Sequence, residues 1–292
     1  MQATAKIATL LCKGSRSHAV NPYADLIDKF PERLEMNQWF MPPELISLYG
    51  TSVFDGMTEA ERMLLSFYET INFFSFTLRG EQVQVEGLAR RLYKKELTDV
   101  SPYLHHFLNE ENNHMAFFGA FCLKYAGKVY PSIYPSMGMT REYAPGEEDF
   151  LFFVKLLTFE ELGDAYNVAV ARDTRVAPIV CEINQRHHQD EARHLTFGRK
   201  MVKELFDHYA PSWSPETLES VRKLLQDFLV ASWWEFYSAR AYRDAGVPGD
   251  IFDTRELAFE NAACRAHRKT MSSKIVNYLI EAQILLTEPE LG

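Results

Sequence analysis

Two glutamate–histidine pairs recur in the sequence at the same spacing. Glu111 is followed three residues later by His114, and Glu191 is followed three residues later by His194. Residues three apart in a helix lie on one face, about one turn apart. An ionised carboxylate on a buried face needs a partner of opposite charge, and a metal ion is a partner that also uses the imidazole. The two pairs therefore predict metal binding.

Both pairs lie on helix faces that are otherwise apolar. Around the first pair, the three- and four-residue steps pass through Leu104, Phe107, Leu108, Phe118, Phe121, Cys122 and Tyr125. His187 lies one turn before Glu191 on the same face. Two such pairs on separate helices, with one glutamate from each of two further helices, form the ligand set of di-iron carboxylate bundles. The sequence should therefore supply two more buried glutamates.

The helix expected over residues 63–92 offers two candidates for the first of these glutamates. Its apolar face consists of Phe67, Ile71, Phe74, Leu78, Val85, Leu88 and Leu92. Glu81 falls on this face. Glu86 points about 140° away, towards Arg79 and Arg90. We therefore predict that Glu81 is a ligand and that Glu86 lies at the surface.

For the third helix, periodicity leaves two adjacent residues open. The steps from Phe153 and Leu156 lead to Glu160, whereas those from Val154 lead to Glu161. Either carboxylate would complete the set. The spacing alone does not choose between them.

With Glu160 in the third helix, the set has four carboxylates and three imidazoles, namely Glu81, Glu111, His114, Glu160, His187, Glu191 and His194. This mixture suits a pair of redox-active iron ions better than structural zinc, which favours thiolates, and manganese is the alternative metal. Asp164 and Asp190 are candidates for carboxylates that orient ligand imidazoles. We expect His188 and His267 at the surface.

The elements that must position these residues are helices. Apolar periodicity and capping signals predict helices over residues 63–92, 101–125, 148–172, 178–209, 215–245 and 254–286, with a long connection over 127–146. Strand signals are nearly absent. We predict an all-α fold, a ferritin-like four-helix bundle core with additional C-terminal helices.

We expect this fold to form one domain over residues 1–292. Residues 1–40 show little periodicity and predict an irregular N-terminal arm, residues 41–210 the metal-binding helices, and residues 211–292 the additional packing helices. An apolar content of 47% provides for a thick core.

The charge balance limits the class of partner. The net charge is −9, and a nucleic acid or an anionic membrane would call for a concentrated basic face, so we expect neither. No apolar run is long enough to span a bilayer, and no secretory signal is evident, so we expect a cytoplasmic protein. The four cysteines form no C-x-x-C pair, which argues against a disulfide framework or a zinc knuckle.

Four segments of the sequence share a pattern with a known family: Leu78-Arg79-Gly80-Glu81, YLHHFLNEENNH from Tyr103 to His114, the pair Glu160-Glu161, and HHQDEARHL from His187 to Leu195. Together they resemble the para-aminobenzoate N-oxygenase (AurF-type) family of non-haem di-iron oxygenases. The resemblance covers residues 39–199. It implies three histidine and four glutamate ligands, and the interval between the third glutamate and the next histidine in the family favours Glu160 over Glu161.

The resemblance also implies a reaction. Members use O₂ as co-substrate and two iron ions to oxidise an amine to a hydroxylamine and, in some cases, to a nitro group. The sequence has no dinucleotide-binding fingerprint and no cysteine cluster for an iron–sulfur centre, so an external electron donor, a reductase or a ferredoxin, is expected. The other expected partner is a small-molecule amine substrate, and a homodimer is one candidate assembly.

Three other functions are compatible with the same ligands. The first is a di-iron hydroxylase or desaturase that acts on C–H bonds. The second is a ferritin-like iron-binding protein for storage or detoxification, although the aromatic content and the extra C-terminal helices favour a closed substrate pocket. A metal-dependent hydrolase is a third alternative.

Overall fold

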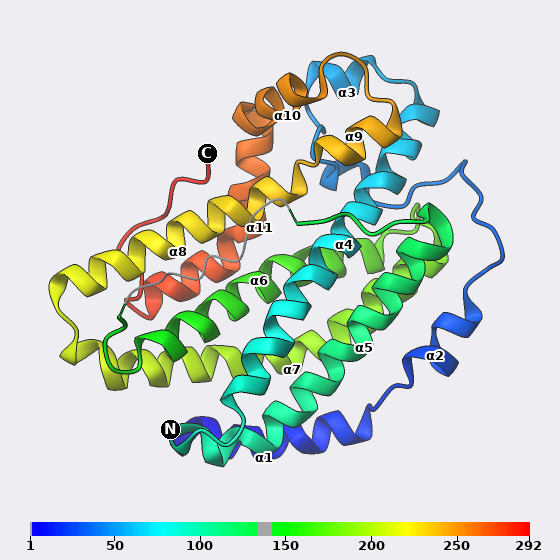
Figure 1. Cartoon of the computed structure of the whole chain (residues 1–292). Coiled ribbons are helices and arrows are strands. Elements are labelled where there is room, and N and C mark those ends of the chain that lie inside the picture. The colour runs from blue at the N-terminus through cyan, green and yellow to red at the C-terminus, as the bar shows by residue number, and fades with distance from the viewer. Residues whose placement is uncertain (1, 133–141) are drawn as a thin grey trace.

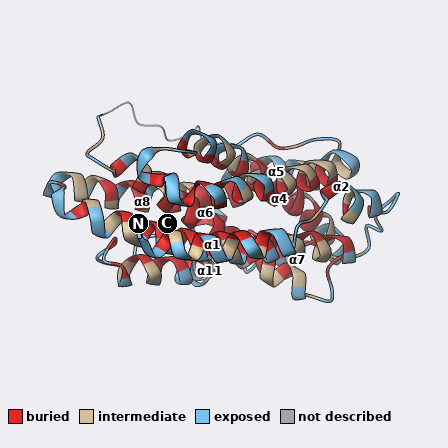
Figure 2. Ribbon diagram, turned by 90° about the horizontal axis from the view of Figure 1, so that it is seen from below, coloured by how far each residue is buried: buried red, intermediate tan, exposed pale blue. Residues whose placement is uncertain are grey.

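A computed structural model describes residues 2–132 and 142–292 of the chain. Four long helices form its centre: α4 (Glu59–Arg91), α5 (Ser101–Ala126), α6 (Glu147–Arg172) and α7 (Pro178–Tyr209). Helix α4 packs along α5, and α6 packs along α7 (Figure 1). The buried stretches of these helices lie towards the middle of the molecule (Figure 2). The predicted all-α fold with a four-helix core is confirmed.

Local signals in the sequence explain where the central helices begin and end. At the start of α4, the Thr58 hydroxyl accepts a hydrogen bond from the Glu61 backbone N–H at 3.3 Å. The Glu61 carboxylate in turn accepts one from the Thr58 N–H at 2.7 Å, which completes a capping box. Helix α5 ends at Gly127, whose φ of 65° is readily adopted by glycine.

The N-terminal segment differs from the prediction of an irregular arm. It opens with a 16-residue helix, α1 (Gln2–Ser17), which packs against α5 and α7, and α2 (Pro22–Asp25) follows. The buried face of α1 consists of Thr4, Ala8, Cys12 and Ser15. These side chains are small and weakly apolar, so they produce little hydrophobic periodicity although their spacing is helical. Residues 26–51 hold only short 3₁₀ turns, before α3 (Ser52–Gly56).

The C-terminal region is helical as predicted, but each expected helix is divided in two. The first becomes α8 (Pro215–Phe236) and α9 (Ala239–Ala245), and the second becomes α10 (Ile251–Glu260) and α11 (Ala262–Glu281). Ser238 and Asn261 cause the breaks, because their side chains accept hydrogen bonds from the first turns of α9 and α11. Helices α8 and α11 pack against α6 (Figure 1).

The connection expected over residues 127–146 contains no helix in its described parts, and residues 133–141 lie outside the described residues. The single β contact among the described residues is a bridge between Trp39 and Val176. No helix within the described ranges combines the length and the apolar character needed to cross a bilayer.

Candidate metal centre

The four central helices bring all seven predicted residues together in the interior. They form two adjoining groups, one of Glu81, His114 and His187, the other of Glu111, Glu160, Glu191 and His194. Within each group, one potential ligand atom per residue lies within 4.8 Å of the others. All seven side chains are buried, with at most 2% of any residue exposed. Each of the four helices contributes at least one carboxylate or imidazole.

Glu111 and Glu191 belong to the second group but also approach histidines of the first. The two oxygens of Glu111 face different histidines: Oε2 is 3.7 Å from His114 Nδ1, and Oε1 is 2.9 Å from His194 Nδ1. Oε1 of Glu191 is 2.9 Å from His187 Nε2 and 3.2 Å from His194 Nδ1. These two carboxylates could therefore serve metal ions in both groups.

The alternative ligands that the sequence offers on α6 and α4 lie in different surroundings within each pair. Glu160 lies in the second group, whereas Glu161 forms ion pairs with Arg199 and with Lys274, the latter at 3.3 Å. Glu86 is exposed and pairs with Arg90 at 2.6 Å. The geometry thus places Glu160 and Glu81, and neither of their alternatives, among the seven.

Each central histidine uses its second ring nitrogen in a hydrogen bond outside the cluster. His114 Nε2 is 3.1 Å from Asp190 Oδ2, and His194 Nε2 is 2.9 Å from Glu110 Oε2. His187 Nδ1 is 2.7 Å from the side-chain nitrogen of Asn167, as the amide is oriented. Such contacts fix the ring and direct the other nitrogen inwards, as at many metal-binding histidines.

Two of these outer partners, Glu110 and Asn167, were missed in the sequence. Glu110 had a visible signal, because it lies one turn before His114 on a largely apolar helix. Asn167 had none, since an asparagine in a helix is ordinarily a surface residue. Arg193 then joins the outer carboxylates, pairing with Glu110 at 2.7 Å and with Asp190.

Two other predictions for this region were wrong in part. Asp164 was expected to orient a ligand imidazole, but its carboxylate is 2.6 Å from His188 Nδ1. His188 was expected at the surface, and its side chain is 30% exposed. The reason is that α6 and α7 pack closely enough to enclose a residue lying about a hundred degrees away from His187. Asp190 has the predicted type of contact, with His114.

Burial and mutual contact shift the pKa values of the cluster. Burial raises the pKa of Glu81 to about 7, and burial together with Glu191 raises that of Glu160 well above its ordinary value. Burial opposes a charge on His187, yet Glu191 and the nearby carboxylate oxygens raise its pKa to about 9. Burial likewise opposes a charge on Glu191, but His194 and His187 lower its pKa well below the usual range. A bound cation would take the place of these shared protons.

Several inward-facing atoms have no hydrogen bond of normal geometry to any described residue. They are both carboxylate oxygens of Glu81, Oε1 of Glu160, Nδ1 of His114 and Nε2 of His187. Unpaired buried carboxylate oxygens are costly, and carboxylates with imidazoles are the donors that divalent iron and manganese accept. The residues present therefore fit a two-metal site.

Aromatic rings pack directly against the buried cluster. The Phe107 ring stacks on His194 with centroids 3.8 Å apart, and Phe118 meets the edge of His187 at 5.0 Å. On the α4–α6 side, a Cβ added to Gly80 would lie 2.0 Å from the Phe159 ring, so only glycine allows this ring to pack directly on α4 beside Glu81.

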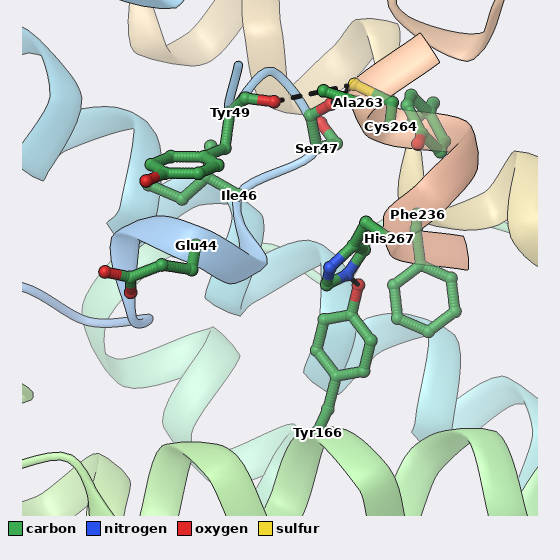
Figure 3. A pocket seen from close by; sticks show the side chains of 10 residues that line it. Glu44, Ile46, Ser47, Tyr49, Tyr166, Phe236, Ala263, Cys264 and His267 are labelled. Atoms are coloured by element: carbon green, nitrogen blue, oxygen red, sulfur yellow. Dashed lines mark hydrogen bonds between the residues drawn. The ribbon is translucent and has the colours of Figure 1, made fainter. Parts of the chain in front are cut away.

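A separate cavity of about 160 Å³ opens between the segment 44–49, α6, α8 and α11. Tyr166, Phe236 and His267 face it (Figure 3), and none of the seven central residues lines it. His267, expected to be solvated, is half-buried, with Nε2 3.2 Å from the Tyr166 hydroxyl. Burial and the neighbouring Arg268 lower the pKa of His267 to about 4, so this imidazole is neutral at pH 7.

Among solved structures, one variant of an R2-like ligand-binding oxidase with an anaerobically reconstituted Mn/Fe cofactor has 11% identity and a TM-score of 0.48, covering 96% of this chain and 93% of its own. A second such variant has 13% identity and a TM-score of 0.46, covering 91% and 93%. A search of curated protein sequences finds no match. The sequence model of one family, described as p-aminobenzoate N-oxygenase AurF, matches residues 1–283. The chain therefore belongs to the p-aminobenzoate N-oxygenase (AurF) family.

Proposed function

We propose that the protein is an O₂-dependent oxygenase that uses two iron ions to oxidise an amine to a hydroxylamine or nitro product. The observation that supports this most is the pair of adjoining, buried ligand groups joined by Glu111 and Glu191, in a chain of the N-oxygenase family. A site with two connected metal positions suits the activation of O₂ better than a single closed position.

The ligands divide naturally between the two positions. Glu81, His114 and His187 would hold one ion, Glu160 and His194 the other, with Glu111 and Glu191 shared. Four ionised glutamates would balance the charge of two Fe²⁺ ions, which removes the need for protons in the cluster. When bound, the irons supply the redox chemistry by which O₂ is activated for oxygen transfer to the substrate nitrogen.

The protein itself contributes ligand orientation and a dry environment. Asp190, Asn167 and Glu110 hold the three imidazoles with one nitrogen facing inwards. The rings of Phe107 and Phe118 cover His194 and His187. These contacts fix the orientation of the ligand imidazoles and limit the access of water to the metal site.

The reaction requires an electron donor and an amine. Conversion of an amine to a hydroxylamine consumes one O₂, two electrons and two protons, and yields one water. The four cysteines are dispersed as free thiols, so the described chain holds no cysteine cluster that could carry an iron–sulfur centre. We therefore propose that a separate reductase or ferredoxin delivers the electrons.

Metal and product analysis together test the proposal. Protein expressed with ample iron should contain two irons per chain. The anaerobic ferrous protein, exposed to O₂ with aromatic amines or with hydrocarbon substrates, should give hydroxylamine or nitro products from the amines. Oxidation of the hydrocarbons alone would identify a C–H oxygenase, and full activity with zinc under nitrogen would identify a hydrolase.

A further inference from the structure

Gly163 is a buried helix residue beside which the protein leaves space. It lies inside α6, and apart from its chain neighbours and the backbone of its own helix, no described atom lies within 4 Å of the position that a Cβ would take. Gly80 and Gly87 are opposite cases, because a Cβ at either would lie 2.0 Å from the ring of Phe159 or Phe152. Those two glycines allow tight packing. Gly163 lines a gap.

The neighbours of Gly163 on α6 show what this gap separates. Glu160 and Asn167 project to one side of Gly163, about 60° and 40° around the helix. Glu160 belongs to the second ligand group, and Asn167 contacts His187. Phe159 and Tyr166 project to the other side by similar angles. The gap therefore lies between the metal-facing side chains and a row of aromatic rings.

Ring contacts link the aromatic residues beside this gap with those that line the cavity of Figure 3. Tyr166 lines that cavity and packs against Phe236 with ring centroids 4.7 Å apart. Phe236 contacts Phe76 at 5.2 Å, and Phe76 contacts Phe159 at 4.9 Å. Phe159 directly precedes the proposed ligand Glu160. A series of contacting rings thus runs from the cavity to the residue that precedes Glu160.

The cavity at the outer end has the size and chemistry for a single aromatic ring. Its volume of about 160 Å³ is close to that of an engineered cavity that admits benzene, about 150 Å³. Neutral His267 uses Nε2 in its contact with Tyr166, and Nδ1 can donate to or accept from a polar group, depending on the tautomer. Apolar walls with few polar groups are typical of small-molecule pockets.

We propose that Gly163 keeps open the passage by which a single-ring aromatic amine moves from this cavity to the metal ligands. The absence of a side chain lets a ring pass between the Phe159–Tyr166 flank and the Glu160–Asn167 flank. The identity of the ligand as an amine substrate rests on the proposed function, whereas the passage itself rests on the packing around α6.

Binding measured without turnover tests the passage. Iron-loaded protein is kept under nitrogen without reductant and titrated with aniline by calorimetry, and the oxidised protein is titrated with azide by its visible spectrum. Gly163→Leu should weaken aniline binding by at least about tenfold, while azide binding and iron content stay as in the wild type. Gly163→Ala should have a smaller effect on aniline. Ala165→Leu, on the opposite side of the same helix, is the matched control and should change neither titration.

The possible results separate the two proposals. Unchanged aniline binding in an iron-loaded Gly163→Leu variant would overturn the passage. Loss of iron from both Gly163 variants would also overturn it, because it would show that no free space exists at this position. If Gly163→Leu blocks aniline as expected but the wild-type protein oxidises no amine, the proposed function is refuted and the passage remains as a route for aromatic rings.

Discussion

Asn167 differs chemically from the other partners of the central histidines. His114 and His194 face carboxylates, whereas His187 faces a neutral amide. A carboxylate raises the basicity of an imidazole more than an amide does, so His187 should be the weakest donor of the three. The two proposed metal positions would therefore be chemically unequal, and we expect His187 to be the imidazole that is most readily displaced.

The contact between Asn167 and His187 can be tested by removing the amide. We expect Asn167→Ala to weaken iron binding by about 10- to 100-fold, because the His187 ring loses the contact that fixes its orientation. Competition with a chelator measures this affinity. An unchanged affinity would mean that packing by Phe118 alone holds the ring, and Asn167→Asp, which keeps a polar partner, should restore most of the binding.

Glu81 and Glu86 lie on different faces of α4, so their replacement should have different effects. Glu81→Ala should lose iron and activity, because it removes a buried carboxylate from the first group. Glu86→Ala should change the free energy of unfolding by no more than about 0.5 kcal/mol, as is usual for exposed positions. Metal analysis and thermal unfolding distinguish the two. Iron loss from the Glu86 variant alone would mean that the face of α4 that carries Glu86, and not the face that carries Glu81, points towards the metal site.

At the scale of elements, two glycines in α4 set the distance to α6. Gly80 and Gly87 lie two turns apart on one face, and the rings of Phe159 and Phe152 occupy the space that a side chain would need. Glycine is unfavourable in a helix interior by about 1 kcal/mol relative to alanine. The close packing, which brings Glu81 and Glu160 towards the same centre, offsets this cost.

Alanine usually stabilises a helix relative to glycine, and at Gly80 it should do the opposite. We expect Gly80→Ala to destabilise the protein by about 1–3 kcal/mol, since the added methyl group overlaps the Phe159 ring. Gly163→Ala, in the same kind of helix but with open space around it, should stabilise the protein by up to about 1 kcal/mol. Denaturant unfolding measures both. Equal effects at the two positions would contradict the packing described for α4 and α6.

Glu69, a buried acid outside the cluster, should influence how the stability of the whole protein depends on pH. Glu69 accepts hydrogen bonds from the Ser47 N–H and hydroxyl, and burial raises its pKa to about 8. The ordinary value is 4.5, so between pH 4.5 and 8 the folded state holds a proton that the unfolded state releases. The contribution of Glu69 to stability is therefore full below pH 4.5 and falls as the pH rises towards 8.

Glu69→Gln should remove this part of the pH dependence. The slope attributable to one such group is about 1.4 kcal/mol per pH unit, so the difference in stability between variant and wild type should shift in favour of the variant from pH 5 to pH 8. Unfolding of both proteins at the two pH values measures it. Glu86→Gln is the exposed control and should show no shift. A constant difference for Glu69→Gln would mean that this carboxyl is ionised in the folded protein.

Much of the bundle could be predicted from the sequence, for identifiable reasons. Phe74, Leu78 and Leu88 on α4 are large and regularly spaced, so they mark the buried face that contains Glu81. Helix α1 has only small buried residues, which produce little hydrophobic periodicity although the helix packs against α5 and α7. Periodicity could not choose between Glu160 and Glu161. The structure separates them because Arg199 and Lys274, distant in sequence, pair with Glu161.

The two shared carboxylates have a consequence for how the protein fills with metal. An ion bound in either group would fix Glu111 and Glu191 in an orientation that the second ion also needs, and by linkage each ion strengthens the binding of the other. Loading should therefore be cooperative, and chains with a single ion should be scarce at every stage of an iron titration. Native mass spectrometry of half-loaded protein should show mainly empty and doubly loaded chains, and a dominant one-iron species would show that the two positions bind independently.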